Sequence, residues 1–284
     1  MTAAPHSTGT EGPQFEVPPG ACDCHMHLFD PALPFAPGPV LRHAEASVAQ
    51  YRQLQHRLRT ERCVLVQPSS YGRDHRVLLA GLQHLGNRAR GIAVIDPSSS
   101  AQELEELQAH GVVGVRFNLV QAGATHAGML EQVARLIQPF GWHVQLHAHP
   151  ADLVALADRL LALPVPVVLD HFARVHCDPA MSRQVVGTVS RLLSSGKASL
   201  KLSAPYIANP GSQAQDGLDG FVRGLVSEFP DQLVWGSDWP HVTESAKPDD
   251  AALMNLLARW LTAGELHRVL VENPARLYRF PFSD

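Results

Sequence analysis

The sequence has few of the features that mark nucleic-acid-binding, membrane-spanning or disulfide-rich proteins. Its 23 Lys and Arg residues are outnumbered by 27 Asp and Glu residues, so the overall charge does not favour binding to nucleic acid or to an anionic membrane. Four cysteines in 284 residues do not make a disulfide framework. No apolar run reaches the ~20 residues that a transmembrane helix requires. We therefore expect a soluble protein of the reduced cytoplasm that binds neither nucleic acid nor membrane.

The first 19 residues, MTAAPHSTGTEGPQFEVPP, are rich in Pro, Gly, Thr and Ala. Such a composition favours loops over packed structure, and the segment has neither the basic start nor the apolar run of a secretory signal. The remaining chain is long and hydrophobic enough to bury one substantial core. We predict a mobile arm at residues 1–19 and a single folded domain at residues 20–284.

Short apolar segments alternate with helical patterns along the rest of the chain. In AQELEELQAH (101–110) and ADLVALADRLLAL (151–163), apolar residues recur every three or four positions, as on one face of a helix. The apolar segments between such patterns have the length of strands that are buried on both faces. Eight strands are predicted, at residues 21–27, 62–68, 90–96, 112–118, 142–148, 165–171, 198–204 and 233–239.

This alternation predicts the fold class. Strands buried on both faces and separated by helices indicate a parallel sheet covered by helices. Eight such units predict a single closed (β/α)8 TIM barrel, an α/β fold of typically ~250 residues. An open, doubly wound sheet is the alternative. Because no predicted strand is followed by the glycine-rich phosphate loop found in many such sheets, we favour the barrel.

Polar side chains collect where the predicted strands end, which is where barrel enzymes place their active sites. His25 and His27 lie two residues apart on the first strand, so their side chains point to the same side. Two imidazoles placed in this way can share a divalent ion, and zinc or manganese sites add further imidazoles and a carboxylate. The other polar residues at strand ends are Arg116, Asn118, His147, His149, Asp170, His171, Lys201, Ser203 and Asp238.

Each of these residues also has a simpler interpretation. Paired histidines at a strand end often form only hydrogen bonds, and Asp238 in GSDWP is equally typical of a turn. His149 and His241, taken singly, are more often structural or solvated than catalytic. The coincidence of several histidines and an aspartate at the strand ends of one barrel favours a site.

Ordered motifs link the chain to a known family. Four of them follow one another as in the amidohydrolase superfamily: CHMH (24–27), LDHFAR (169–174), WGSDWPH (235–241) and ENPARLY (272–278). The chain resembles the amidohydrolase-related branch of this superfamily. GVVGVRFNLV (111–120) and GWHVQLHA (141–148) are further similar to the lactonases that act on 2-pyrone-4,6-dicarboxylate. The resemblance extends over roughly residues 20–280 and implies a hydrolase built on a barrel.

The resemblance implies roles for residues at the centre of the barrel. The Lys or Glu that bridges two metal ions in some members is missing, and Arg116 stands in that region, so at most one zinc or manganese ion is implied. The pyrone lactonases lack a histidine at the position of His147 and act without a metal, so metal-free catalysis is the alternative. The implied metal ligands are His25, His27, His147 and Asp238, and His171 joins them as a catalytic residue.

The resemblance also bears on the substrate. Arg116 and Arg174 match arginines that hold substrate carboxylates, to which a guanidinium can bind in a bidentate manner. Ala122 and Ile207 stand where two further arginines are expected. The implied substrate is therefore a lactone with one carboxylate, or a sugar-acid lactone held through its hydroxyl groups. Other candidates for substrate contacts are Ser69, Ser70, His147, His149, Lys201, Tyr206 and His241.

Together these roles predict hydrolysis of a lactone ring. Asp238 would deprotonate water, while a metal ion or histidines such as His171 would polarise the ring carbonyl. The alternatives are a metal-dependent decarboxylase or a metal-free lactone isomerase on the same fold, and the weakest is a noncatalytic carboxylate-binding barrel. The resemblance also implies a place in catabolism. The sequence leaves a homo-oligomer open.

Overall fold

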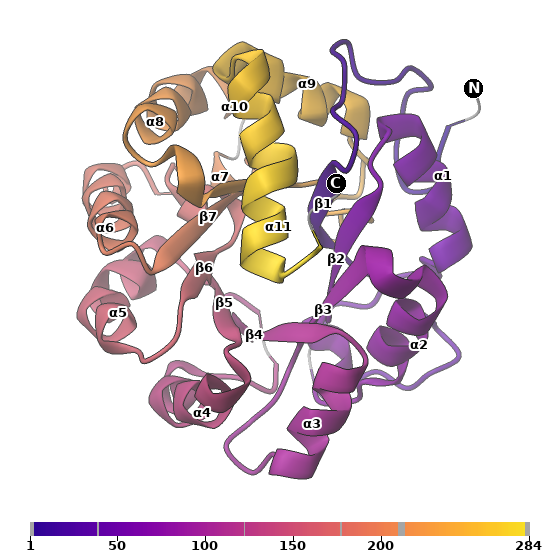
Figure 1. Ribbon diagram of the computed structural model, residues 1–284, viewed down its shortest axis with the longest axis vertical. Coiled ribbons are helices and arrows are strands. Elements are labelled where there is room, and N and C mark those ends of the chain that lie inside the picture. The colour runs from indigo at the N-terminus through magenta and orange to yellow at the C-terminus, as the bar shows by residue number, and fades with distance from the viewer. Residues whose placement is uncertain (1–2, 39, 122, 177, 210–213, 282–284) are drawn as a thin grey trace.

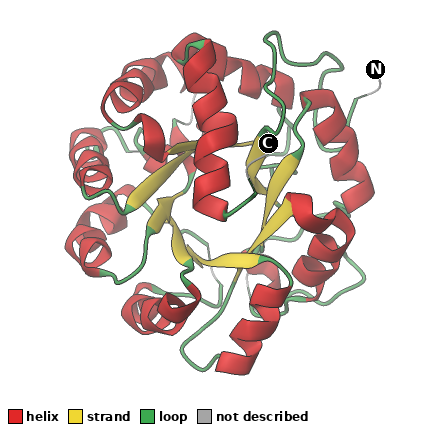
Figure 2. Ribbon diagram, viewed as in Figure 1, coloured by secondary structure: helices red, strands yellow, loops and turns green. Residues whose placement is uncertain are grey.

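Eight parallel strands follow one another around a barrel in the order β1 to β8, and helices surround them (Figures 1 and 2). This computed structural model describes residues 3–38, 40–121, 123–176, 178–209 and 214–281. The fold is the predicted (β/α)8 barrel. The open-sheet alternative is wrong, because the last strand returns to lie beside the first.

The observed strands agree closely with the predicted ranges. All but one of these ranges contain the observed strand, and β3 begins one residue earlier than predicted. The strands are β1 (Cys22–Met26), β2 (Arg62–Val66), β3 (Ala89–Ala93), β4 (Val112–Asn118), β5 (His143–His147), β6 (Val167–Leu169), β7 (Ala198–Ser203) and β8 (Leu233–Gly236).

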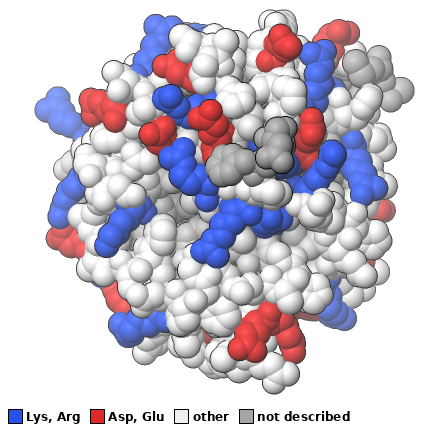
Figure 3. Space-filling model, viewed as in Figure 1, with Lys and Arg blue, Asp and Glu red and all other residues white. Residues whose placement is uncertain are grey.

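Helices lie between the strands around the barrel, as expected. Among the described residues, no helix combines the length and the apolar character needed to cross a bilayer. On the face that α11 covers, acidic and basic side chains are interspersed (Figure 3). The helices are α1 (Val48–Leu58), α2 (Arg76–Leu85), α3 (Ala101–Ala109), α4 (Leu130–Ile137), α5 (Pro150–Ala162), α6 (Ser182–Ser194), α7 (Pro205–Ala208), α8 (Ala214–Glu228), α9 (Asp250–Trp260), α10 (Ala263–His267) and α11 (Asn273–Tyr278).

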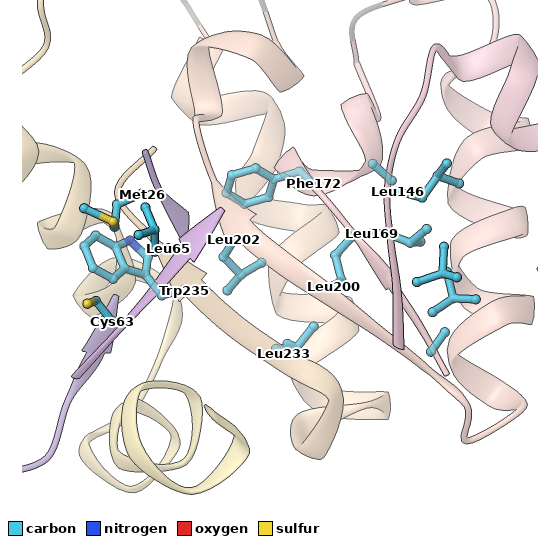
Figure 4. Close-up of a cluster of buried hydrophobic side chains, with 14 of the residues drawn as sticks. Met26, Cys63, Leu65, Leu146, Leu169, Phe172, Leu200, Leu202, Leu233 and Trp235 are labelled. Carbon is cyan, nitrogen blue, oxygen red and sulfur yellow. The ribbon is translucent and has the colours of Figure 1, made fainter. Parts of the chain in front are cut away.

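The main core lies between the outer face of the barrel and the helices. On β7, Leu200 and Leu202 alternate with polar residues and are at most 1% exposed, and Trp235 of β8 lies in the same layer (Figure 4). The helices supply the other side, as in α4, where Leu130 and Ile137 are fully buried. This burial of apolar surface between the strands and the helices holds the barrel together.

The barrel closes where the end of β1 meets the residues after β8. The backbone N–H of Asp238 donates to the carbonyl oxygen of His25 at 2.8 Å, and the N–H of His27 donates to that of Trp239 at 2.8 Å. Gly236 permits this approach, because a Cβ at Gly236 would lie 2.6 Å from the Cβ of His25. Closure therefore brings together the first and the last of the predicted site residues.

The described part of the predicted arm, residues 3–19, lies against the barrel. The buried guanidinium of Arg57 on α1 donates to the carbonyl oxygen of Thr8 at 2.8 Å. Trp239 Nε1 donates to the carbonyl oxygen of Pro5 at 2.7 Å. The segment is thus attached beside the closure of the barrel, while its independence from the folded domain stays a prediction.

The opposite, amino-terminal end of the barrel is filled by His143 and covered by α11 (Figure 1). The imidazole lies beside Tyr278 of α11, with ring centroids 5.6 Å apart. Gly114 on β4 leaves room for it, since a Cβ there would lie 2.7 Å from the His143 ring. Burial, followed by the charge of Lys201, lowers the pKa of His143 to about 3. The ring is therefore neutral in the folded protein at neutral pH.

This neutral imidazole predicts acid-sensitive stability. The unfolded chain binds a proton at His143 near its ordinary pKa of 6.5, whereas the folded chain does so only near a pKa of about 3. The contribution of the neutral His143 ring to the free energy of unfolding is therefore fully present above pH 6.5 and is lost as pH falls toward 3. The free energy of unfolding, measured with urea across this pH range, should depend less steeply on pH for His143→Gln than for the parent. The exposed His110→Gln serves as control, and an unchanged slope in His143→Gln would contradict the assignment.

Candidate active site

Asp23 of β1 holds the closure in place. Its carboxylate accepts hydrogen bonds from the backbone N–H groups of His25 at 3.1 Å and Ser237 at 2.9 Å. It also accepts from the hydroxyl groups of Ser237 at 2.6 Å and Tyr51 at 3.0 Å. Burial raises the pKa of Asp23 to about 6, although these donors favour its charged form. The bonds fix the backbone next to His25 and next to Asp238.

Backbone strain is concentrated at the same end of the barrel. The chain has positive φ at residues 171–174 after β6, at Ala204 after β7, and at Asp238 and His241 after β8, with values from 49° to 65°. Such conformations cost roughly 1–3 kcal/mol each in residues other than glycine and cluster at functional sites. The strands thus end in turns that aim particular side chains at the barrel axis.

Asp238 lies among three imidazoles. Its Oδ1 is 3.6 Å from His25 Nε2, 3.6 Å from His27 Nε2 and 3.8 Å from His171 Nε2. Burial acts to raise the pKa of Asp238, but interactions with His171 and His27 outweigh burial and lower it. The carboxylate is therefore ionised at neutral pH, as a general base or a metal ligand must be.

Nε2 of His27 faces this carboxylate. Its Nδ1 lies 2.7 Å from the carbonyl oxygen of Val66, which can only accept, so Nδ1 carries the hydrogen. In the neutral ring Nε2 is then an acceptor, and it faces Asp238 Oδ1, a second acceptor, at 3.6 Å. A cation, or the hydrogens of a bound water, would remove this repulsion.

His25, His27 and Asp238 fit a metal ion. Their ligand atoms form a triangle with sides of 3.3, 3.6 and 3.6 Å. Two ligands at about 2.1 Å from a tetrahedral ion are about 3.4 Å apart, so the triangle matches one face of such a site. His25 Nδ1 lies 3.3 Å from Asp170 Oδ1 and can donate its hydrogen there. The His25 Nε2 lone pair is then free, as in other metal-binding histidines that are held by a carboxylate.

His147 lies outside this group of ligand atoms. Its Nε2 is 3.3 Å from Arg174 Nη1, and because a guanidinium only donates, Nε2 accepts. Burial, followed by the charges of His171 and Arg116, lowers the pKa of His147 and keeps the ring neutral. Its Nδ1 then carries the hydrogen, and that buried atom has no hydrogen-bond partner in the structure. The structure thus brings together three of the four predicted ligands, and a ligand role for His147 stays a prediction, while Nδ1 of His147 is placed to donate.

Lys201 lies beneath His25 and does not line the cleft in which substrate contacts were predicted. Its fully buried ammonium donates to the carbonyl oxygen of Cys24 at 2.9 Å and to Gln145 Oε1 at 2.7 Å. It is also 3.3 Å from His25 Nδ1 and 3.5 Å from Asp170 Oδ1. Burial, followed by the charge of Lys201, lowers the pKa of His25 well below its ordinary value. Lys201 therefore helps to keep His25 neutral.

A cleft opens above Asp238 at the carboxyl ends of the strands. Arg116 is 5% exposed there, and its Nε is buried without a hydrogen-bond partner in the structure. A ligand rich in oxygen would satisfy this donor and Nδ1 of His147. The residues that line the cleft are His27, Leu41, Ser70, Arg116, Asn118, Gln121, His147, His171, Ile207, Asp238, Val242 and Thr243.

Other predicted substrate contacts lie outside this lining. The Ser69 hydroxyl accepts a hydrogen bond from Asn118 Nδ2 at 3.0 Å, and His149 is exposed immediately before α5. Tyr206 and His241 contact each other at 2.8 Å behind Asp238. A position near a strand end does not fix the direction of a side chain once the chain has left the strand. Ala122 lies outside the described residues.

Sequence reasoning missed Asp23 and Asp250. The alternation of side chains along a strand places Asp23 on the same side as the histidines, but it does not reveal that Asp23 bonds to β8 and to α1. Asp250 is 3.1 Å from His241 Nε2 and is fully buried. An acidic residue in the first turn of a helix is common, so no local pattern distinguishes it.

Comparison with known proteins identifies the family of this chain. The sequence profile of the amidohydrolase family matches residues 22–280. The chain belongs to the amidohydrolase family. A crystal structure of an Agrobacterium tumefaciens protein resembles this amidohydrolase with a TM-score of 0.86 at 28% identity, covering 98% of this chain and 99% of that one.

Two relatives carry named activities. This amidohydrolase is 35% identical over 281 residues to a 2-pyrone-4,6-dicarboxylate hydrolase of Comamonas testosteroni, covering 94% of this chain and 92% of the relative. It is 29% identical over 273 residues to a D-galactarolactone isomerase of Agrobacterium fabrum, covering 94% of each chain. The two relatives thus include a hydrolase and an isomerase, both named for cyclic esters.

The ligand triangle of this amidohydrolase predicts one divalent ion per chain. His27→Ala should weaken zinc or manganese binding by about 100-fold or more. Replacing even the groups that hydrogen-bond to metal ligands typically weakens metal binding by about 10–100-fold. His147→Ala should change it by less than about 3-fold, since His147 Nε2 is engaged by Arg174. Calorimetric titration of metal-depleted protein measures both. Equal weakening by the two substitutions would place His147 among the ligands.

Proposed function

We propose that the protein hydrolyses the ring ester of a small lactone that carries a carboxylate or several hydroxyl groups. The observation that carries this proposal is the ionised Asp238 beside three imidazoles, at the base of a cleft where Nε of Arg116 and Nδ1 of His147 are buried without a hydrogen-bond partner in the structure. Such a site can accept an oxygen-rich ring and activate a water against it. The hydrolase of Comamonas testosteroni, at 35% identity, supports the same reaction class.

The cleft favours a lactone with one carboxylate. Arg116 is the only arginine among the described residues that line it, and Ile207 and Val242 add apolar surface. The guanidinium would bind the carboxylate, and Nδ1 of His147 would donate to a second oxygen. Asn118 and Thr243 offer amide and hydroxyl groups to a sugar-acid ring. Holding the ring in one orientation contributes to the rate by lowering the entropic barrier.

The chemistry would begin with proton transfer from water to Oδ1 of Asp238. The water then attacks the ring carbonyl and generates a tetrahedral oxyanion. His171 is placed to stabilise that oxygen: if its Nδ1 accepts from the Ser203 hydroxyl, 3.0 Å away, its Nε2 carries a hydrogen. The intermediate collapses with cleavage of the bond to the ring oxygen, and Asp238 returns its proton to that oxygen.

The lowered pKa of Asp238 makes it a weak base, so the water it deprotonates needs further activation. We propose that His25, His27 and Asp238 would hold one zinc or manganese ion. When bound, such an ion would acidify water and polarise a carbonyl group. In the metal-free alternative, Lys201 donates to Nδ1 of His25, and Nε2 of His25 then carries a hydrogen that can be donated within the site.

A lactone isomerase is the second candidate, because the Agrobacterium fabrum relative bears that name. In that reaction a hydroxyl group of the substrate would attack the ring carbonyl, and the bond from that carbon to the ring oxygen would break. Asp238 would carry the proton from the attacking hydroxyl to the departing oxygen, and no water would be consumed. A metal-dependent decarboxylase and a noncatalytic barrel are not favoured by either named relative. A cytoplasmic location, a role in catabolism and assembly into a homo-oligomer remain proposals of the same kind.

Asp238→Asn should lower kcat by about 100-fold or more, because it removes the base while keeping the shape of the side chain. KM should change little, since Arg116 and His147 remain. Initial rates on a panel of aromatic-acid and sugar-acid lactones measure the effect, and product analysis separates the ring-opened acid from an isomer. Asp158→Asn, which alters an exposed ion pair with Arg191, is the matched control. Turnover near that of the parent would exclude Asp238 as the base.

A further inference from the structure

A series of hydrogen bonds, part-buried at Tyr206 and fully buried at His241 and Asp250, leads away from the side of Asp238 that does not face the histidines. The hydroxyl of Tyr206, on α7, lies 2.9 Å from Oδ2 of Asp238 and 2.8 Å from Nδ1 of His241. Nε2 of His241 lies 3.1 Å from Oδ2 of Asp250, the first residue of α9. These hydrogen bonds connect the segments that follow β7 and β8 to the start of α9.

Counting the available hydrogens assigns a donor and an acceptor to each of these hydrogen bonds. An ionised Asp238 can only accept, so the single hydroxyl hydrogen of Tyr206 is donated to its Oδ2. The Tyr206 oxygen then accepts from Nδ1 of His241, whose Nε2 donates to the carboxylate of Asp250. In this arrangement both ring nitrogens of His241 act as donors, Nδ1 to Tyr206 and Nε2 to Asp250.

We propose that Tyr206, His241 and Asp250 form a positioning chain that fixes the carboxylate of Asp238. Oδ2 is held by Tyr206, which leaves Oδ1 directed at His25, His27 and His171. The proposal rests on the role of Asp238 as base in the proposed function. It gives Tyr206 and His241 a task different from the substrate contacts that the sequence predicted.

Burial and backbone contacts hold the positioning chain in one conformation. His241 and Asp250 are fully buried, and burying an ionic pair generally adds little net stability because of the cost of desolvation. Its contribution therefore lies in specifying geometry. The backbone at His241 is held at a φ of 57°, and its N–H donates to the carbonyl oxygen of Asp238 at 2.8 Å.

The N-terminal segment supports the far end of the positioning chain. The backbone N–H of Asp250 donates to the hydroxyl oxygen of Ser7 at 3.3 Å. Arg57 donates to the same oxygen at 3.1 Å. The start of α9 is thus fixed against both the segment and α1, so Asp250 has a stable position from which to orient His241.

Tyr206→Phe tests the proposal because it removes only the hydroxyl group. We expect kcat for lactone hydrolysis to fall about 10–100-fold, as for other groups that orient a reacting side chain, with KM changed less than about 3-fold. His241→Ala should have a similar effect, and His241→Asn should recover part of the loss, because the Asn amide nitrogen can replace Nδ1 as donor to Tyr206. Tyr278→Phe, which removes a buried hydroxyl at the other end of the barrel, should match the parent.

Two further measurements separate positioning from general damage. In an Asp238→Asn background, Tyr206→Phe should cause little additional loss, because both act through the same carboxylate. Crystal structures of the parent and of Tyr206→Phe should show the carboxylate rotated in the variant. Three outcomes would each overturn the proposal: a full additional loss of kcat in the double variant, a carboxylate of Asp238 that does not move in Tyr206→Phe, or a kcat of Tyr206→Phe equal to that of Tyr278→Phe. If the parent opens no lactone, the proposed function fails, and the crystal comparison still decides the positioning chain.

Discussion

The closure of the barrel between β1 and the residues after β8 is the constraint on which the whole site depends. Two backbone hydrogen bonds of 2.8 Å join these segments, and they place His25 and His27 against Asp238, more than 200 residues later in the chain. Gly236 permits the approach by lacking a side chain, and Asp23 holds it by accepting from β1 and from Ser237. Neither Gly236 nor Asp23 lines the cleft. Their effect on chemistry passes through the backbone, which sets the triangle of ligand atoms.

Burial of charge is the second constraint, and it follows from the first. Closing the barrel removes water from Asp170, Lys201 and the imidazole of His25, all of which are at most 1% exposed. Burial and the ammonium together lower the pKa of His25, while Asp170 keeps its charge because His25 and Lys201 outweigh its burial. The layer beneath the site therefore holds ions, whereas burial lowers the pKa values of His25, His147 and His171 and favours their neutral forms. Neutral imidazoles can act as metal ligands or as hydrogen-bond donors, and imidazolium ions could not bind a metal.

The sequence predicted the barrel because strand burial leaves a local record: apolar runs of the right length, separated by helical periods. It predicted His25, His27, His171 and Asp238 for a related reason, since carboxyl ends of strands meet at one end of a barrel. It did not predict that Tyr206 and His241 turn toward Asp238 instead of the cleft, because both follow residues with positive φ. Backbone turns of this kind, and the contact of Asp250 with His241, depend on packing between segments that are distant in sequence. Periodicity carries no information about them.

The two oxygens of Asp238 have separate environments, and this division links the fold to the reactivity of the site. Oδ1 faces three imidazoles, while Oδ2 accepts from a phenol that is itself held by a buried imidazole. A free carboxylate exchanges its oxygens by rotation about χ2, a broad torsion with little intrinsic preference. Once Oδ2 accepts from Tyr206, rotation would break that hydrogen bond of a carboxylate that is only 5% exposed, which costs about 1–3 kcal/mol. The site therefore obtains a directed base from contacts made on its unreactive side. These contacts come from α7, from the residues after β8, from α9 and from the N-terminal segment.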